Sequence, residues 1–401
     1  MGCPSGYPQY SAGSFANGQS GTYQFSSTPI YSFPPFGSVF SGQVWAVYTI
    51  LQYSGNLTTQ MATIVAKNVG ASSTSPSSAL YVPITITNSQ SAATPAPFQQ
   101  MITFNPSSYA QYENSNLGNI RFYQGSTELH SWCESGCSST ASQAVFWVNL
   151  PNGIPASSKV TVNMAFEPAS MNYDGVYAGE APQLSSTYAQ YDDGASVFNN
   201  YWNFAGTSLP SGLVTSGSGG TITINNGIHL VETTAGDGES LGFSTAQSTN
   251  NRVREAAINL YGSSGSDIRD RVNPSLAGTS IGDFGYFSQS SLSNQVEYYF
   301  NGWIGTYTPT FTSATSPLII DSQSYTSSGT CYWDSYNYGS YTSPIYQNSY
   351  TFTAGSTYTN GYAATLDSGG SIESSMYIYW IRIRAYPPNG VMPSVSFGSV
   401  Q

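Results

Sequence analysis

Two serines have the Gly-x-Ser-x-Gly spacing that hydrolases use for a nucleophile, in Gly238–Gly242 and in Gly278–Gly282. Such a serine needs a turn from a strand into a helix, and a histidine later in the chain. Both histidines, His130 and His229, precede these serines, and no helical pattern follows either motif. Matches of this kind arise by chance in a chain rich in Ser and Gly, so the spacing does not indicate a serine hydrolase.

Carboxylates offer a second chemistry. Glycoside hydrolysis needs two facing carboxylates, and a Glu-x-Asp-x-Glu triplet on a strand would place them on one face, but no such triplet occurs. Glu297, in the predicted strand Val296–Phe300, could point into a cleft, although a solvent-facing carboxylate is the favoured interpretation. The other candidate acids are Glu134, Glu167, Asp192, Asp193, Glu232, Asp237, Glu239 and Asp321.

Two acidic loops raise the question of a metal ion. Residues 192–194 (Asp-Asp-Gly) and 237–239 (Asp-Gly-Glu) could bind calcium, but neither has the ligand spacing of a known loop motif. Turns favour Asp-Gly equally well. Zinc is not expected, because the chain has two histidines and no second close pair of cysteines. We therefore expect no cofactor, with calcium as the open alternative.

The cysteines fit a disulfide framework. Cys133 and Cys137 enclose a short turn and could close a small disulfide loop, while Cys3 and Cys331 could pair over a long range. Four cysteines allow three pairings, and their spacing does not choose among them. Asn56 begins an Asn-Leu-Thr glycosylation sequon.

Two arginines lie two positions apart in the last predicted strand. Arg382 and Arg384 therefore project to one face of that strand, opposite Ile381 and Ile383. They could clamp a carboxylate or a sugar. The preferred interpretation is structural, with both arginines salt-bridged to acids on a neighbouring strand.

The aromatic loop Thr330–Gly339 is the best candidate for recognition. Aromatic rings stack on sugar faces, Asn, Asp and Ser supply hydrogen bonds, and tyrosine gives a large contact area at low entropic cost. Packing of the rings on neighbouring strands or subunits explains the same sequence equally well. The candidate glycan-binding residues are Tyr332, Trp333, Tyr336 and Tyr338, with Trp303 as a weaker one.

The composition limits the partners. Only 7% of the 401 residues are charged, and the chain carries 32 tyrosines and 40 glycines, whereas an average soluble protein is about 25% charged. The net charge of -11 argues against nucleic acid and against anionic membranes. No apolar run approaches the ~20 residues of a membrane span. The first residues lack the regions of a signal peptide, so we expect either that a signal was removed or that the protein leaves the cell in a virion.

Val, Ile, Thr and aromatic residues alternate along most of the chain, which predicts an all-β fold of tandem β-sandwiches with no amphipathic helix. We expect an extended tail over residues 1–38, a short β segment and Ser-rich linker over 39–78, sandwiches over 79–190 and 191–388, and a second extended tail over 389–401. The predicted strands are 40–53, 61–68, 80–87, 98–104, 120–123, 144–150, 159–166, 253–260, 285–287, 296–300, 317–321, 350–353 and 376–385, with a hairpin over 219–231.

Residues from about 80 to 180 resemble an uncharacterised domain family of archaeal exported proteins, in the segments Tyr81–Thr87, Pro97–Phe104, Gly118–Tyr123 and Phe146–Pro151. Residues 191–386 resemble a concanavalin/LamG-like jelly roll, which opens with the residues 201–204 (Tyr-Trp-Asn-Phe). The ending, residues 384–397, is similar to that of surface and virus-associated proteins of hot-spring archaea. The resemblance implies the fold, an extracellular setting and adhesion or assembly, and it supplies no catalytic residues.

We therefore expect a non-enzymatic extracellular structural or adhesive protein on a cell or virion surface. It would be a subunit of an archaeal surface filament or virion fibre, with a jelly-roll head that grips glycans or the next subunit. Its partners would be copies of itself and cell-surface glycans. The segment 1–38 or the tail Val391–Phe397 could add a strand to a neighbour's sheet. The alternatives are a carbohydrate-active enzyme (glycoside hydrolase or lyase) with a concanavalin-like domain, and a surface-layer component without a ligand.

Overall fold

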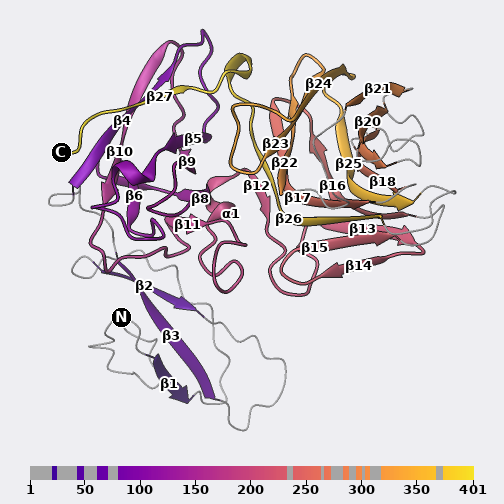
Figure 1. Cartoon of the computed structure of the whole chain (residues 1–401). Helices are drawn as coiled ribbons and strands as arrows, with labels where there is room; N and C mark the ends of the chain where they lie inside the picture. Colours follow the sequence, from indigo (N-terminus) through magenta and orange to yellow (C-terminus); the bar gives the residue numbers. More distant parts are fainter. Residues whose placement is uncertain are drawn as a thin grey trace. The chain divides into compact units, whose positions relative to one another are not determined.

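The computed structural model describes residues 20–24, 43–48, 61–70, 80–232, 238–262, 266–271, 283–288, 295–299, 303–307, 318–366 and 374–401. The chain divides into two compact units, residues 1–75 and 76–401, and each is described by itself (Figure 1). Strands dominate both units, which confirms the all-β class. Within the described ranges the helices are single turns, and none has the length and hydropathy that crossing a bilayer requires.

The first unit contains a three-stranded antiparallel sheet in the order β1-β3-β2. Its strands are β1 (Ser20–Gln24), β2 (Gln43–Tyr48) and β3 (Met61–Gly70). The pairing of β2 with β3 agrees with the neighbours expected from the sequence. Strand β1 lies within the segment for which only an extended tail is predicted, and it pairs with the edge of β3 opposite β2.

Two sheets form the N-terminal sandwich of the second unit. The first sheet has the order β27-β4-β10-β6-β7, and the second sheet has the order β11-β8-β9-β5. Their elements are β4 (Leu80–Asn88), β5 (Phe98–Phe104), the 3-10 turn η1 (Pro106–Ser108), β6 (Ile120–Gln124), β7 (Thr127–Leu129), β8 (Ser131–Ser135), β9 (Ala144–Leu150), β10 (Ser158–Phe166), β11 (Ala178–Glu180) and β27 (Ser394–Phe397).

Two further sheets form the C-terminal sandwich. The third sheet runs β14-β15-β26-β17-β22-β23-β24, with β12 also paired to β26, and the fourth sheet runs β13-β16-β25-β18-β19-β20-β21. Their elements are α1 (Gly194–Val197), β12 (Asn200–Trp202), β13 (Leu213–Ser218), β14 (Thr221–Ile224), β15 (Ile228–Glu232), β16 (Gly238–Ser248), β17 (Arg252–Gly262), β18 (Ser266–Arg271), β19 (Asp283–Ser288), β20 (Gln295–Tyr299), β21 (Trp303–Tyr307), β22 (Ile319–Tyr325), β23 (Thr330–Asn337), β24 (Tyr346–Thr351), β25 (Thr357–Leu366), β26 (Ser374–Ala385) and the 3-10 turn η2 (Pro388–Gly390).

Residue alternation explains which faces meet. In β4, Val82, Ile84 and Ile86 are fully buried, and the residues between them are half-buried, as a strand with one core face requires. Strand β9 differs, because six of its seven residues are buried and both of its faces are covered. One face of β9 meets the first sheet and the other meets the C-terminal sandwich.

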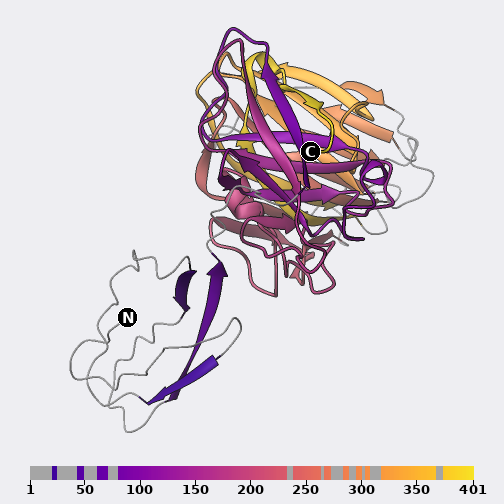
Figure 2. The same cartoon turned by 90° about the vertical axis from the view of Figure 1, so that its left-hand side faces the viewer.

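The two sandwiches share a third core between the second and third sheets, which we call the interface core (Figure 1). Figure 2 shows the same stack with the N-terminal sandwich towards the viewer. Because this core covers the outer faces of both sheets, residues 80–401 form one stack of four layers. Its buried members are Trp132, Val145, Trp147, Ala181, Val197, Phe198, Ala257, Ile320 and Trp380.

Two predicted loops or tails are strands in the structure. The aromatic segment after Thr330 is strand β23, in which Cys331, Trp333 and Ser335 alternate as buried residues, so its rings are divided between two faces. The C-terminal tail forms β27, which pairs with β4 of the same chain over four residues. The tail was expected to add a strand to a neighbour's sheet. In this structure it instead adds a strand to the edge of β4 in its own chain.

Candidate functional site: the interface between the two sandwiches

Arg382 and Arg384 lie on the face of β26 that points towards the N-terminal sandwich. Strand β17 is the neighbour of β26, and its Glu255 lies opposite Arg382 in the register. Glu255 accepts from Arg382 Nε at 2.7 Å and from Arg384 Nη2 at 2.8 Å and Nε at 3.0 Å. The structural interpretation of the two arginines is therefore correct: they pair with an acid on the adjacent strand.

A second carboxylate reaches the same arginine from the other sandwich. Arg382 Nη1 donates to Glu134 Oε2 at 2.7 Å, and both side chains are fully buried. Trp147 Nε1 also donates to this oxygen at 2.7 Å, and the Tyr341 hydroxyl donates to Glu134 Oε1 at 2.8 Å. Glu134 thus connects strands of the second and third sheets through charge-assisted hydrogen bonds.

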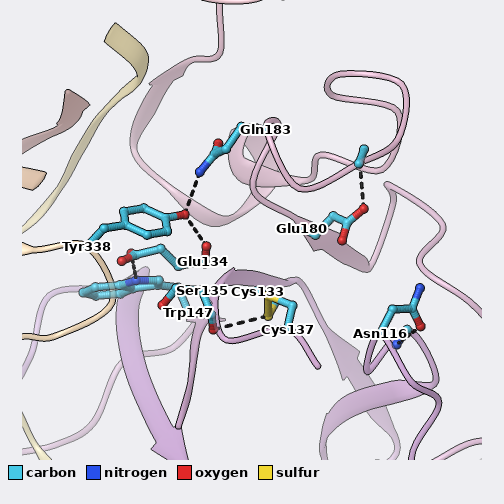
Figure 3. The surroundings of a disulfide bond; sticks show 11 residues. Asn116, Cys133, Glu134, Ser135, Cys137, Trp147, Glu180, Gln183 and Tyr338 are labelled. Carbon is cyan, nitrogen blue, oxygen red and sulfur yellow. Dashed lines mark hydrogen bonds between the residues drawn. A yellow bond between two sulfur atoms is a disulfide. The ribbon is translucent and has the colours of Figure 1, made fainter. Parts of the chain in front are cut away.

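The local structure of β8 explains how Glu134 reaches the interface core. The register between β8 and β9 shifts between Cys133 and Ser135, so Glu134 is the extra residue of a β-bulge, a feature that re-aims a side chain. The disulfide between Cys133 and Cys137 spans the bulge. Figure 3 shows Glu134 beside Trp147 and the disulfide on the opposite side of the strand.

Aromatic rings enclose the Arg382 guanidinium. Its Cζ lies 4.4 Å from the ring centroid of Trp147, 4.7 Å from Trp380 and 4.8 Å from Phe198. The ring of Trp132 lies 5.6 Å away. These contacts are within cation–π range. Aromatic rings therefore contact the guanidinium in addition to the carboxylates that accept its hydrogen bonds.

The charges of this cluster balance. Burial alone would raise the pKa of Glu255, but the guanidinium groups of Arg382 and Arg384 outweigh it and lower that pKa to about 2. The paired carboxylates likewise raise the pKa of Arg382, against its burial. Two guanidinium groups face two glutamates, Glu134 and Glu255. The cluster is therefore an internal ion network, and it connects the two sandwiches as a structural element.

The predicted glycan-binding aromatics separate into three environments. Trp333 is fully buried in the C-terminal sandwich, where its indole N–H donates to Asp321, so its ring is closed to a sugar. Tyr336 is half-buried, with its ring centroid 5.3 Å from that of Tyr341. Tyr332 is 42% exposed.

The remaining two candidates have different outcomes. The hydroxyl of Tyr338 donates to the carbonyl of Glu134 and accepts from Gln183 Nε2 at 2.7 Å, so this residue belongs to the interface between the sandwiches (Figure 3). The backbone of Trp303 begins β21, and its side chain lies outside the described residues.

The cysteine and glycosylation predictions are only partly covered by the structure. Cys133 and Cys137 form the short disulfide that their spacing allows. Cys331 is fully buried in the C-terminal sandwich, with its thiol 3.7 Å from the carbonyl oxygen of Tyr332. Its suggested partner Cys3, and the sequon residue Asn56, lie outside the described residues.

The structure describes one of the two serine motifs, and that one lacks the geometry of a nucleophile turn. Ser240 lies in the middle of β16, not on a turn into a helix, and its Oγ is 2.8 Å from that of Ser216. The second serine motif, 278–282, lies outside the described residues. Glu297 belongs to β20, but its side chain is likewise not described.

The acidic loop before α1 is occupied by protein donors. Asp192 accepts from Trp132 Nε1 at 2.8 Å, from Asn203 Nδ2 at 2.7 Å and from the backbone of Gly194 at 2.9 Å. Burial raises the pKa of Asp192. Over the described ranges, no group of three His, Cys, Asp or Glu side chains is arranged to hold a metal ion. Asp237, in the other acidic loop, lies outside these ranges.

The sequence reasoning missed most members of the interface core. It considered Glu134 as a catalytic acid, and it did not single out Glu255, Trp132, Trp147 or Tyr341. One signal was available, because Glu255 interrupts the apolar residues of a predicted strand and the two arginines require an acid nearby. Glu134 lies two residues after Trp132 and therefore on the same face of β8, but the sequence did not show that this face meets the other sandwich.

Comparisons with known proteins give one curated relative. No family model matches the chain. "Uncharacterized protein 562" of Sulfolobus islandicus rod-shaped virus 1 is 33% identical over 358 residues. The alignment covers 78% of this chain and 58% of the relative, so the chain spans little more than half the length of that protein.

Several solved structures match part of the chain at low sequence identity. The exoplasmic/lumenal domain of VIP36, bound to Ca²⁺ and Man3GlcNAc, is 9% identical, with 47% of this chain and 94% of that chain covered at a TM-score of 0.33. Arcelin-5, a lectin-like defense protein from Phaseolus vulgaris, is 10% identical, with 46% and 98% covered at 0.32. A glycosyl hydrolase family protein from Mycobacterium fortuitum is 11% identical, with 46% and 99% covered at 0.35.

Proposed function

We propose that the protein is a non-enzymatic structural and adhesive component of a virion or surface filament that works outside the cell. The observation that carries this proposal is the ion network beside the interface core, in which Arg382 and Arg384 pair with Glu134 and Glu255 and join the two sandwiches. Buried ion pairs are poorly screened by salt. Since the pKa of Glu255 is about 2, its pairs with the arginines persist in acid. Two sandwiches joined by ion pairs that resist salt and acid suit a protein that is exposed to the solution outside the cell.

The relative from a rod-shaped virus supports the virion setting. In this proposal the chain contacts copies of itself within the particle or filament and presents its C-terminal sandwich to glycans.

The structural roles of the described carboxylates support a protein without catalytic activity. Glu134 and Glu255 serve the ion network, Asp192 is saturated by donors, and Glu239 accepts from the backbone of Gly220 at 3.1 Å. Glu167 accepts from the hydroxyl of Tyr123 at 3.0 Å. Each of these acids has a structural partner, whereas a glycosidase needs two carboxyl groups facing a substrate cleft.

Immunogold electron microscopy of native particles and cells tests the proposal. Antibodies against the full chain should label the surface of virions or of cell-surface filaments. Label confined to the cell interior would contradict the structural role. Incubation of the purified chain with a panel of polysaccharides should release no reducing ends, and sustained release would favour the glycoside hydrolase alternative.

A further inference from the structure

A row of polar and aromatic residues crosses four strands of the third sheet on the face away from the sandwich core. Thr223 of β14 lies opposite His229 of β15, His229 lies opposite Tyr377 of β26, and Tyr377 lies opposite Asn259 of β17. Tyr379 follows two residues later on β26. We call these five residues the tyrosine face.

The tyrosine face lies beside the interface core. Met376 and Ile378, which alternate with the two tyrosines, are fully or almost fully buried in the C-terminal sandwich, so Tyr377 and Tyr379 point the other way. Both tyrosines are half-buried, and Thr223 is exposed. Tyr379 packs at the margin of the interface core. The face therefore continues the third sheet beyond the area that the N-terminal sandwich covers.

The rings of this face are held in fixed positions. The centroids of Tyr377 and Tyr379 are 4.7 Å apart with their planes at 61°, and the His229 ring lies 5.8 Å from Tyr377. The Tyr377 hydroxyl donates to the carbonyl of Asn226 at 2.9 Å. Gly227 lies under this ring, where a Cβ would come within 2.3 Å of the hydroxyl oxygen. The turn residue thus makes room for the ring, and ordering costs on binding are small.

We propose that the tyrosine face binds a neutral glycan, an inference that rests on the proposed adhesive function and names its ligand and its site. Tyrosine rings offer flat apolar area to the C–H faces of a pyranose, and the hydroxyl groups of the tyrosine face supply hydrogen bonds. Adjacent strands are about 4.8 Å apart, so the row presents one side chain after another along an extended saccharide.

The charge pattern decides between ligand classes. The tyrosine face contains no Asp, Glu, Lys or Arg, and the whole chain has a net charge of -11. Acidic polysaccharides and nucleic acids would therefore meet repulsion without a compensating basic group. An uncharged glycan fits both the neutrality and the hydrogen-bonding capacity.

Binding of the full chain to immobilised mannan, laminarin, galactan, cello-oligosaccharides, alginate and heparin tests the inference. We expect binding to at least one neutral glycan and not to the two acidic ones. Tyr379→Ala should weaken that binding about tenfold, which corresponds to ~1.4 kcal/mol. The hydrogen bond from Tyr188 to residue 379 uses the backbone carbonyl, so this variant keeps it. Tyr379→Trp should retain the affinity.

Tyr81→Ala is the matched control, because Tyr81 is half-buried like Tyr379 but lies on β4 of the N-terminal sandwich, away from the tyrosine face. We expect it to change binding less than about twofold. Equal losses in both alanine variants, or binding to no neutral glycan, would overturn the inference. If particles are still labelled in the immunogold experiment, such a result removes the glycan site and leaves the structural role intact.

Discussion

At the scale of single residues, the clearest consequence of the structure concerns Glu134. This side chain is fully buried against Arg382 and accepts from Trp147 and Tyr341. Removing its charge leaves a buried guanidinium with one carboxylate fewer, and breaking a buried pair costs about 3–5 kcal/mol. We expect Glu134→Gln to lower the free energy of unfolding by roughly this amount, as measured by urea denaturation.

Glu167 provides the control for that substitution. It is half-buried at the surface of the N-terminal sandwich, where it accepts from the Tyr123 hydroxyl. The amide oxygen of Gln can accept the same hydrogen bond, so Glu167→Gln should change the free energy of unfolding by less than about 0.5 kcal/mol. Equal effects of the two substitutions would show that the interface core contributes no more than an ordinary surface acid.

Glu113 makes the free energy of unfolding depend on pH. Neither of its carboxyl oxygens has a hydrogen-bond partner in the described part of the chain, and burial raises its pKa from 4.5 to about 8. The folded state therefore holds a proton that the unfolded state releases between these values, so the free energy of unfolding falls as pH rises from about 4.5 to 8. The stabilising effect is complete below pH 4.5.

Glu113→Gln isolates this group, because glutamine cannot ionise. The variant should gain stability relative to the parent chain at pH 9 and gain much less at pH 4, in urea denaturation at the two pH values. A difference between the two proteins that does not change with pH would contradict the assignment.

At the scale of elements, the β8 bulge and the disulfide lie within the same five residues, 133–137. The bridge between Cys133 and Cys137 closes a loop with a sequence separation of 4 directly beside Glu134. A loop this short contributes about 2 kcal/mol in the chain-entropy model. We expect Cys137→Ser to lower the free energy of unfolding by about this amount and to raise deuterium uptake in β8. Dithiothreitol should destabilise the parent chain and leave the variant unaffected.

The sequence predicted some strands correctly and did not indicate others. Strands β4, β5, β9 and β10 follow from alternating apolar residues, and the turn around Gly227 follows from its Asn-Asn-Gly sequence. Strand β23 was missed, because its tyrosines and its tryptophan read as one exposed aromatic loop when no partner strands are known. The pairing of β27 with β4 joins residues more than 300 positions apart, and no local pattern encodes such a contact.

The same limit applied to the functional residues. The two arginines of β26 could be assigned a structural role, since their spacing fixes a common face and such a pair was expected to form salt bridges with acids on a neighbouring strand. The tyrosine face could not be recognised, because its members come from β14, β15, β17 and β26 and become neighbours only through the register of the third sheet. Sequence therefore predicts the faces of strands better than the rows that cross them.

At the scale of the whole molecule, the central claim is that the interface core makes the two sandwiches one rigid body. Buried tryptophans and an internal ion network lie between them, so neither sandwich can unfold without exposing the other's outer face. The two should therefore open as one cooperative unit. Independent sandwiches would instead have unrelated stabilities.

Hydrogen–deuterium exchange of the full chain in increasing urea, resolved by peptide, measures this most directly. Peptides from β9 in the N-terminal sandwich and from β26 in the C-terminal sandwich should lose protection at the same urea concentration, and Glu134→Gln should shift both midpoints together. Separate midpoints in the parent chain, or a shift in β9 alone, would contradict the claim.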